Sequence, residues 1–460
     1  MTDTLGLEAQ ERWDLRESEV LGPGVGKRRA RKGPDWLKKA IVIEIFPRAF
    51  SPEGTLEGIR QRLRDLASVG VDALCLMPIH PIGRKGRKGS CGSPYAVRNH
   101  FEIHPELGSK EDLRRLIADA HRLRLRVILD FIATRAANDH VELAVHRDWY
   151  VRDEKGEPVR EIPGWTDVVC LDLGNPEVRE YLLSAMLYWV REFDVDGFRC
   201  EAAGRAPLGF WEEARRLLDA ERRDLCLLAE WSDPGLHLSA FDATYDWRFH
   251  RTLLDVRAGR QPASAVVEGL AAEERRFPRG AVRLRFLESH DEKRAADAFG
   301  LDALEAYVTL LFTVGGVPVL YNGQLEGDDV RPSLFEKHVV AQEPLNPFVP
   351  KLYRRLIRLR KENPVFANGR LIPLPNSLPR YVVSFARFAR RQVAVVVVNL
   401  RDRKSEVIVE FPESVRRGRE DWLFADLGWQ KLRMFRKPQL FLEVGPYEAC
   451  AYVGEPEGGT

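Results

Sequence analysis

The chain has 460 residues, too many for one ordinary domain but suited to an α/β barrel of roughly 250 or more residues followed by a smaller module. Its 71 basic and 69 acidic side chains give a net charge of +2. No strong field therefore attracts nucleic acid or an anionic membrane, and we expect neither as a partner. A neutral or small polar substrate fits this charge balance better.

The N-terminal 20 residues are acidic and lack the basic start and apolar stretch of a secretory signal, and no run of 18 apolar residues follows. We therefore expect a cytoplasmic protein. The six cysteines are scattered without a Cys-x-x-Cys pair or ligand-like spacing, which predicts buried reduced thiols rather than disulfides or a metal centre. No cofactor is predicted.

Residues 1–37 mix charge with glycine and proline, and GKRRARKG at 26–33 is their dense basic run. A role in nucleic-acid binding or localisation is one reading of that run. We favour the other, a solvated and partly disordered N-terminal arm.

From Ala40 onward, short apolar runs alternate with amphipathic segments, a pattern typical of βαβ units and a parallel sheet. Eight such runs predict an α/β fold with a closed (β/α)₈ barrel over residues 38–370. The predicted strands are 41–45, 73–77, 126–131, 195–199, 225–229, 241–244, 283–287 and 317–321. The helices expected between and after them include 56–69, 110–123, 177–192, 208–222 and 351–361.

Two segments depart from this alternation. Residues 132–172 are long, polar and rich in tryptophan, proline and glycine, which predicts a lobe inserted after the third strand, beside the barrel mouth. Residues 371–460 contain short β-rich runs at 381–388, 392–400, 405–411 and 440–444, which predict a small antiparallel β-sandwich domain.

Carboxylates end three of the predicted strands. The fourth ends in Asp196-Gly-Phe-Arg-Cys-Glu201, the fifth in Leu227-Leu-Ala-Glu230-Trp231 and the seventh in Phe286-Leu-Glu-Ser-His290-Asp291. Barrels of this kind build their active sites at the C-terminal strand ends. One such glutamate alone would more often be an ion pair at the rim. Three carboxylates at strand ends instead favour a pocket in which two of them flank a glycosidic bond. Retaining hydrolysis requires these two carboxyl groups to lie about 5–5.5 Å apart.

Several sequence motifs, taken together, resemble those of one known protein family. Gly92-Ser-Pro-Tyr95-Ala-Val, Asp196-Gly-Phe-Arg199, Ala229-Glu230, Ser289-His290-Asp291 and Gly316-Val-Pro-Val-Leu-Tyr-Asn-Gly323 stand in the order of the α-amylase family, glycoside hydrolase family 13. The chain resembles that family over about residues 38–363.

The resemblance implies roles for these residues. Glu230 would be the acid/base and Asp291 the stabiliser of the transition state, while Arg199 and His290 would hold charge and hydroxyl groups near the reacting sugar. Tyr95 would be the platform beneath that sugar. The family's nucleophile is aspartate, and this chain has Glu201 at that position.

A second departure follows the third strand, where the family typically has Asp-x-x-x-Asn-His and this chain has Asp130-Phe-Ile-Ala-Thr134-Arg135. The family histidine contacts the reacting sugar, so Arg135 is a candidate substrate-binding residue together with Asp130. The asparagine often binds calcium; threonine is a poor calcium ligand, and we predict no metal at that site. Arg135 would either reach Glu201 across the pocket floor, holding the nucleophile off the line of attack, or turn outward to Asp139 or solvent.

Several aromatic residues stay ambiguous. Trp231 and Tyr245 are near enough to the mouth to be sugar platforms, and Trp165 would either stack on a sugar or pack the lobe onto the barrel. His80, His100 and His140 are predicted to be structural.

The predicted function is retaining hydrolysis of α-glucosidic bonds. Ala203-Gly204-Arg205 lacks the Lys-His pair common in starch-degrading α-amylases, which favours short maltooligosaccharides or related α-glucans. Two alternatives stay open: a catalytically weak or inactive barrel that binds a glucan, and a transglycosylase such as a trehalose-forming enzyme. The sequence does not indicate an oligomeric state.

Overall fold

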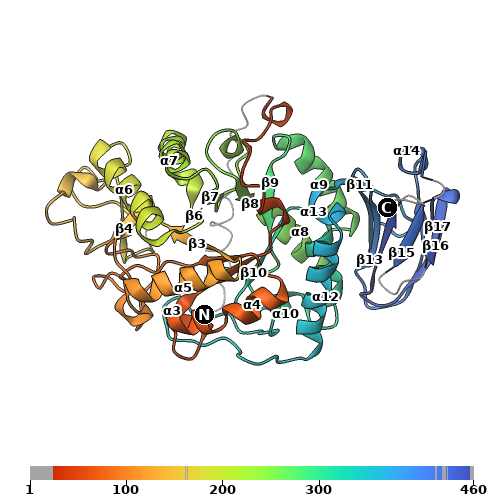
Figure 1. The fold of residues 1–460 in the computed structure, drawn as a ribbon, viewed down its shortest axis with the longest axis horizontal. Helices are drawn as coiled ribbons and strands as arrows, with labels where there is room; N and C mark the ends of the chain where they lie inside the picture. Colours follow the sequence, from red (N-terminus) through yellow and green to blue (C-terminus); the bar gives the residue numbers. More distant parts are fainter. Residues whose placement is uncertain are drawn as a thin grey trace.

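The computed structural model describes residues 24–160, 162, 164–419, 422–426, 431–432 and 434–455. Met1 to Pro23, most of the predicted N-terminal arm, lie outside these ranges. Figure 1 shows a helix-wrapped barrel with a β-rich domain at one side of it.

Eight parallel strands close into the barrel in the order β1-β10-β9-β8-β7-β6-β3-β2. This arrangement confirms the predicted fold, and the bounds differ from the expected ones by at most two residues. The strands are β1 (Val42–Ile45), β2 (Ala73–Leu76), β3 (Arg126–Phe131), β6 (Gly197–Cys200), β7 (Cys226–Ala229), β8 (Ala243–Tyr245), β9 (Val282–Arg285) and β10 (Val317–Tyr321).

Side chains alternate between the barrel interior and the helical layer. Val42 and Ile128 belong to the interior cluster, whereas Ile43 and Leu129 pack in the cluster that includes the helices. Because successive strand residues point to opposite faces, Glu44 and Asp130 share the inward face of their strands. The alternation that places apolar side chains in the barrel core therefore also places the charged groups of Glu44 and Asp130 at the barrel mouth.

The main helices are α3 (Leu56–Gln61), α4 (Leu63–Val69), α5 (Lys110–Arg122), α6 (Pro176–Phe193), α7 (Leu208–Glu221), α8 (Trp247–Arg257), α9 (Ser264–Arg276), α11 (Leu304–Thr313) and α12 (Phe348–Glu362). Shorter ones are α2 (Pro47–Phe50), α10 (Ala295–Phe299), α13 (Val365–Asn368) and α14 (Glu413–Arg416). The single helix expected over 56–69 is two, interrupted at Arg62, whose φ of −95° and ψ of 0° leave the helical region. No helix among the described residues is long and apolar enough to cross a membrane.

The basic run of the arm is exposed at Lys27, Arg28, Arg29 and Lys32, as predicted, but it is also anchored to the barrel. The Ala30 amide donates to the Arg279 carbonyl at 3.1 Å, and Arg31 pairs with the buried Asp242 and, at 3.3 Å, with Asp219. The arm is held because Arg31 neutralises a carboxylate that the barrel has taken out of water.

The predicted lobe contains strands β4 (Arg135–Ala137) and β5 (Val168–Cys170), which pair antiparallel. Aromatic rings join it to the barrel: the ring centroids of His100 and His140 lie 5.5 Å apart, and each ring packs edge-on against Tyr181. Burial lowers the pKa of His140 to about 4. These neutral, packed histidines have the structural environment that the sequence analysis expected.

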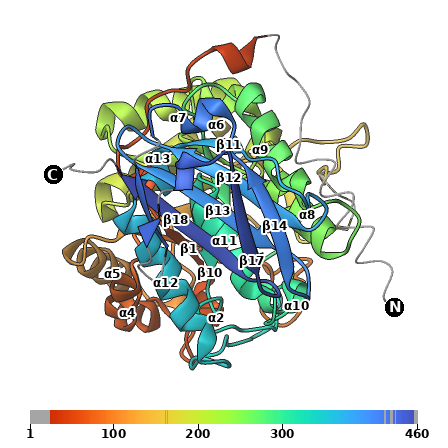
Figure 2. The same ribbon diagram turned by 90° about the vertical axis from the view of Figure 1, so that its right-hand side faces the viewer.

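The C-terminal domain pairs a six-stranded sheet, in the order β11-β12-β13-β18-β15-β16, with the ribbon β14-β17, and Figure 2 shows it in front of the barrel. Its strands are β11 (Arg370–Pro373), β12 (Val382–Phe388), β13 (Val393–Asn399), β14 (Ser405–Glu410), β15 (Leu423–Asp426), β16 (Lys431–Leu432), β17 (Gln439–Val444) and β18 (Ala449–Glu455). Buried Arg387 of β12 links the two domains by donating to the backbone carbonyls of Val314, just after α11, and Phe366 in α13. Buried Arg360 of α12 donates to the same Phe366 carbonyl.

The expectation of buried thiols holds for only half of the cysteines. Cys75, Cys200 and Cys226 are buried, because they lie on barrel strands, and Cys91, Cys170 and Cys450 are partly exposed. All six are free.

Candidate active site

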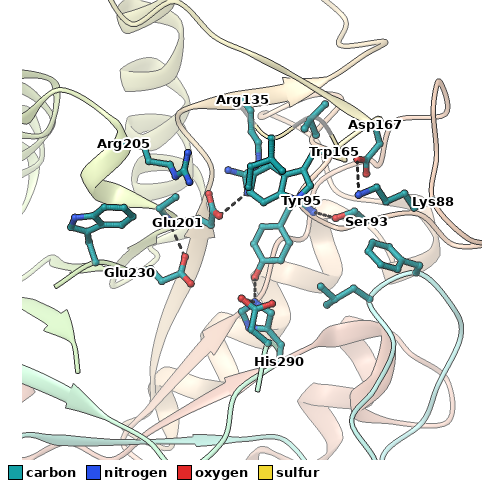
Figure 3. A pocket seen from close by; sticks show the side chains of 17 residues that line it. Lys88, Ser93, Tyr95, Arg135, Trp165, Asp167, Glu201, Arg205, Glu230 and His290 are labelled. Atoms are coloured by element: carbon teal, nitrogen blue, oxygen red, sulfur yellow. Dashed lines mark hydrogen bonds and ion pairs between the residues drawn. The ribbon is translucent and has the colours of Figure 1, made fainter. Parts of the chain in front are cut away.

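One pocket at the barrel mouth is lined by residues that are far apart in sequence (Figure 3). The three strand-end carboxylates Glu201, Glu230 and Asp291 all line it. So do the predicted residues Tyr95, Arg135, Trp231 and His290, with Lys88, Trp165, Asp167, Arg205 and Phe335 completing much of the wall.

Glu201 follows β6, and its amide continues the sheet pattern by donating to the Phe131 carbonyl at 3.0 Å. Its Oε1 accepts a hydrogen bond from Arg135 Nη2 at 2.6 Å. Its Oε2 is buried and has no hydrogen-bond partner among the described residues. One oxygen of this carboxylate is therefore anchored by Arg135.

Arg135 projects from β4 in the lobe to reach Glu201, as Figure 3 shows. Its guanidinium lies over the Trp165 ring, 4.5 Å from the centroid. Asp139, the outward alternative, pairs instead with Arg98 at 3.3 Å. Of the two orientations considered for Arg135, the structure has the inward one, and Trp165 stacks on the guanidinium.

Glu230 is held by the barrel. Its Oε1 lies 3.0 Å from Arg199 Nη2, and its Oε2 accepts from the Ala202 amide at 3.1 Å. Arg199 also pairs with Asp130 at 2.6 Å. Burial alone would lower the pKa of Arg199, but Asp130 and Glu230 outweigh it and raise the pKa well above its ordinary value.

Asp130 and Arg199, both predicted to contact substrate, are not among the pocket-lining residues. They lie at the C-terminal ends of β3 and β6, almost wholly buried and facing one another in register. Strand geometry turns both side chains into the barrel, and direct substrate contact by these two residues stays a prediction.

His290 links the pocket wall to that buried layer. Its Nδ1 contacts the Glu44 carboxylate, and its Nε2 lies 3.0 Å from the Tyr95 hydroxyl, which donates to Asp130 at 3.2 Å. Burial would lower the pKa of His290, but Glu44 and Asp291 outweigh it and raise the pKa to about 9. The imidazolium is therefore charged at neutral pH and donates from both nitrogens.

The two other candidate platforms belong mainly to the core. Trp231 is only 4% exposed, and its indole lies so close to Gly204 that a Cβ there would come 2.0 Å from the indole nitrogen. Tyr245 is 3% exposed, and its hydroxyl accepts from Arg199 Nε at 3.4 Å. Both rings are largely buried, but Trp231 lines the pocket, and its role as a substrate platform stays a prediction.

Glu44 is the functional-site residue that the sequence analysis missed. A signal existed, because a lone charged residue within the apolar run Val42-Ile-Glu-Ile45 must find a partner when buried. Phe335 gave no such signal, since it lies on the long segment between β10 and α12.

The threonine in place of the family's asparagine, Thr134, has a buried hydroxyl that finds no hydrogen-bond partner within the described part of the chain. Nor do the described residues include a group of three or more His, Cys, Asp or Glu side chains able to hold a metal ion.

Comparisons with known proteins show which family this chain resembles. Residues 26–349 match the family described as alpha amylase, catalytic domain. Alpha-amylase MalA of Haloarcula japonica is 31% identical over 404 residues, covering 83% of this chain and 58% of its own length. An intracellular maltogenic amylase of Bacillus subtilis is 28% identical over 390 residues, 74% of this chain and 65% of the relative.

Solved structures give the same result. A noncanonic maltogenic alpha-amylase, AmyB from Thermotoga neapolitana, superposes with a TM-score of 0.80 at 33% identity, covering 91% of this chain and 97% of its own. An alpha-amylase from Lactobacillus plantarum also has a TM-score of 0.80, at 27% identity, with 91% and 99% covered. This chain belongs to the alpha-amylase family.

Proposed function

We propose that this protein is a retaining α-glycoside hydrolase that acts on α-glucosidic bonds of short maltooligosaccharides or related α-glucans. The observation that carries the proposal is the pairing of two anchored carboxylates in one pocket: Glu201, with Oε2 unengaged, and Glu230, oriented by Arg199 and the Ala202 amide. Relatives named maltogenic amylase and cyclomaltodextrinase support this substrate class.

In the proposed reaction, Glu201 Oε2 attacks the anomeric carbon while protonated Glu230 gives its proton to the leaving glycosidic oxygen. The bond to the leaving sugar breaks, and an ester to Glu201 forms. Glu230, now a carboxylate, takes a proton from water, and the hydroxide attacks the same carbon and releases Glu201. The configuration is retained after two inversions.

The remaining pocket residues would stabilise the charge that develops on the sugar. Asp291 lines the same pocket and can face an oxocarbenium-like centre with its negative charge. Tyr95 is held by hydrogen bonds to Asp130 and His290, so its ring would form a fixed wall for the sugar.

A substrate survey tests the proposal. The protein is incubated with aryl α-glucosides, maltooligosaccharides and trehalose, and the products are analysed by chromatography. We expect smaller maltooligosaccharides or glucose in the α-configuration. Products longer than the substrate, or trehalose formed from maltose, would indicate transglycosylation. No turnover of any substrate at high protein concentration would indicate a glucan-binding barrel.

Chemical rescue tests the assignment of the two carboxylates. Azide should replace the nucleophile in Glu201→Ala and produce a β-glycosyl azide from an activated α-glycoside. In Glu230→Ala, azide should instead attack the glycosyl-enzyme and produce the α-azide. The two products control for each other, and an α-azide from Glu201→Ala would exclude Glu201 as the nucleophile.

The cytoplasmic location expected from the sequence also stays a proposal. It is supported by the Bacillus subtilis relatives, whose names describe them as intracellular. Immunodetection in fractionated cells tests it.

A further inference from the structure

The contacts of Glu201 divide its two carboxylate oxygens. Oε1 receives the Arg135 hydrogen bond at 2.6 Å, and Oε2 is buried with no partner among the described residues. A glutamate has one more rotatable bond than aspartate, so without a restraint its carboxylate would sample several orientations in the pocket. A single strong, charge-assisted hydrogen bond on one oxygen restricts that freedom.

The restraint comes from the lobe rather than from the barrel. Arg135 lies on β4, which is paired to β5 with Arg135 opposite Cys170. The face of its guanidinium is covered by Trp165 at 4.5 Å. Trp165 in turn packs against the small cluster of Ile82, Ala96, Ala137 and Val168. A chain of contacts thus runs from the packed lobe through Trp165 and Arg135 to Glu201.

We infer that Arg135 is a positioning residue that fixes the Glu201 carboxylate for attack on the reacting sugar, rather than holding it off the line of attack, and that Trp165 holds Arg135 in place for this task. The inference rests on the proposed function, because it assigns a purpose to a carboxylate that must first be the nucleophile. It gives the lobe a catalytic role: the lobe orients the attacking group as well as bounding the pocket.

The arrangement accounts for both sequence departures together. Glu201 extends one methylene further than the aspartate usual at this position, and Arg135 is long enough to meet it from the segment that follows the adjacent strand β3. Arginine presents a planar, rigid donor group that both stacks on an indole and binds a carboxylate, which a lysine does less well. The pair therefore acts as one unit in which neither member is replaceable alone.

The test is a set of variants assayed with 4-nitrophenyl α-maltoside. Arg135→Ala should lower kcat by roughly 100-fold, the cost of misplacing a reacting group by about 1 Å, with little change in KM. Guanidinium at non-denaturing concentration should restore part of the lost kcat. Arg135→Lys should retain more activity than Arg135→Ala. Trp165→Leu, which keeps both charged partners, should lower kcat by roughly tenfold.

Arg98→Met is the matched control, because it removes an ion-paired arginine that does not line the pocket; its kcat should equal that of the wild type. If Arg135→Ala does not fold, Arg135→Lys and Trp165→Leu decide. Wild-type kcat in Arg135→Ala, or in both of those variants, would overturn the inference. So would a loss that guanidinium does not reverse in a folded Arg135→Ala. A wild-type protein without turnover would instead contradict the proposed function itself.

Discussion

The two carboxylate–arginine pairs of the pocket are built in different ways. The Glu230–Arg199 pair belongs to the barrel: both residues stand at the C-terminal ends of adjacent strands, and Arg199 is fixed a second time by Asp130. The Glu201–Arg135 pair joins a barrel strand end to a lobe strand, and its arginine stacks on the Trp165 indole.

This difference shows which part of the chemistry depends on the fold and which part on the insertion. Hydrogen-bonded strands over-determine the position of Glu230, so the acid/base should tolerate changes in the lobe. The position of Glu201 depends on how well the lobe packs. Each prediction below perturbs one side of this comparison.

The largest loss of activity is expected from Glu230→Gln, which changes the Glu230–Arg199 pair of the barrel. The variant keeps the shape of the side chain but cannot donate the proton, so hydrolysis of an unactivated maltooligosaccharide should fall by about 10²- to 10⁴-fold. Steady-state rates measure this loss. The first turnover of α-maltosyl fluoride should fall much less, because fluoride leaves with little need for a proton. Equal losses on both substrates would contradict the assignment of the acid.

The next largest effect is expected for the Glu201–Arg135 pair. It is measured in a double-mutant cycle of Glu201→Asp, Arg135→His and their combination. Shortening residue 201 alone withdraws the carboxylate from the guanidinium, and replacing Arg135 alone leaves the glutamate unanchored. The double variant should therefore be more active than the two single effects predict, with a coupling of about 1–2 kcal/mol. Measured kcat/KM values for α-glucosides decide. Strict additivity would mean that the two sites act independently.

Acid should weaken the lobe before it weakens the barrel. The pKa values of His80 and His140, at the seam between them, are lowered by burial to about 4. An unfolded histidine titrates near 6.5, so the unfolded chain binds more protons below that pH. The stabilisation is complete above about pH 6.5 and is lost as the pH falls toward 4.

We therefore expect the Tm to drop between pH 7 and pH 5, measured by circular dichroism in buffers of equal ionic strength. His140→Gln, which retains hydrogen-bonding groups but does not titrate, should make this drop smaller. The same pH dependence in the variant and the wild type would show that His140 does not carry the effect.

The smallest effect is expected from calcium removal. Because Thr134 stands at the usual calcium-ligand position, EDTA should leave the Tm unchanged. Neither the barrel nor the lobe should lose stability. A fall of several degrees that calcium reverses would reveal a different ligand set.

Much of the site was predictable because it follows from strand ends. Glu201, Glu230 and Asp291 each lie just after a predicted strand, and parallel strands in a barrel deliver their ends to one mouth. The break in the helix over residues 56–69 was not predictable, since the apolar spacing continues through Arg62. Nor was the docking of Arg31, whose partner Asp242 lies 211 residues away.

The sequence by itself determined the barrel, its family and the convergence of the carboxylates, because periodic apolar runs and strand-end motifs are local properties of the chain. Only the tertiary structure decided which groups touch. It turned Asp130 and Arg199 beneath the pocket floor, buried Trp231 against Gly204 and directed Arg135 to Glu201 rather than to Asp139. Those choices depend on distances between segments far apart in sequence, and no local pattern encodes such distances.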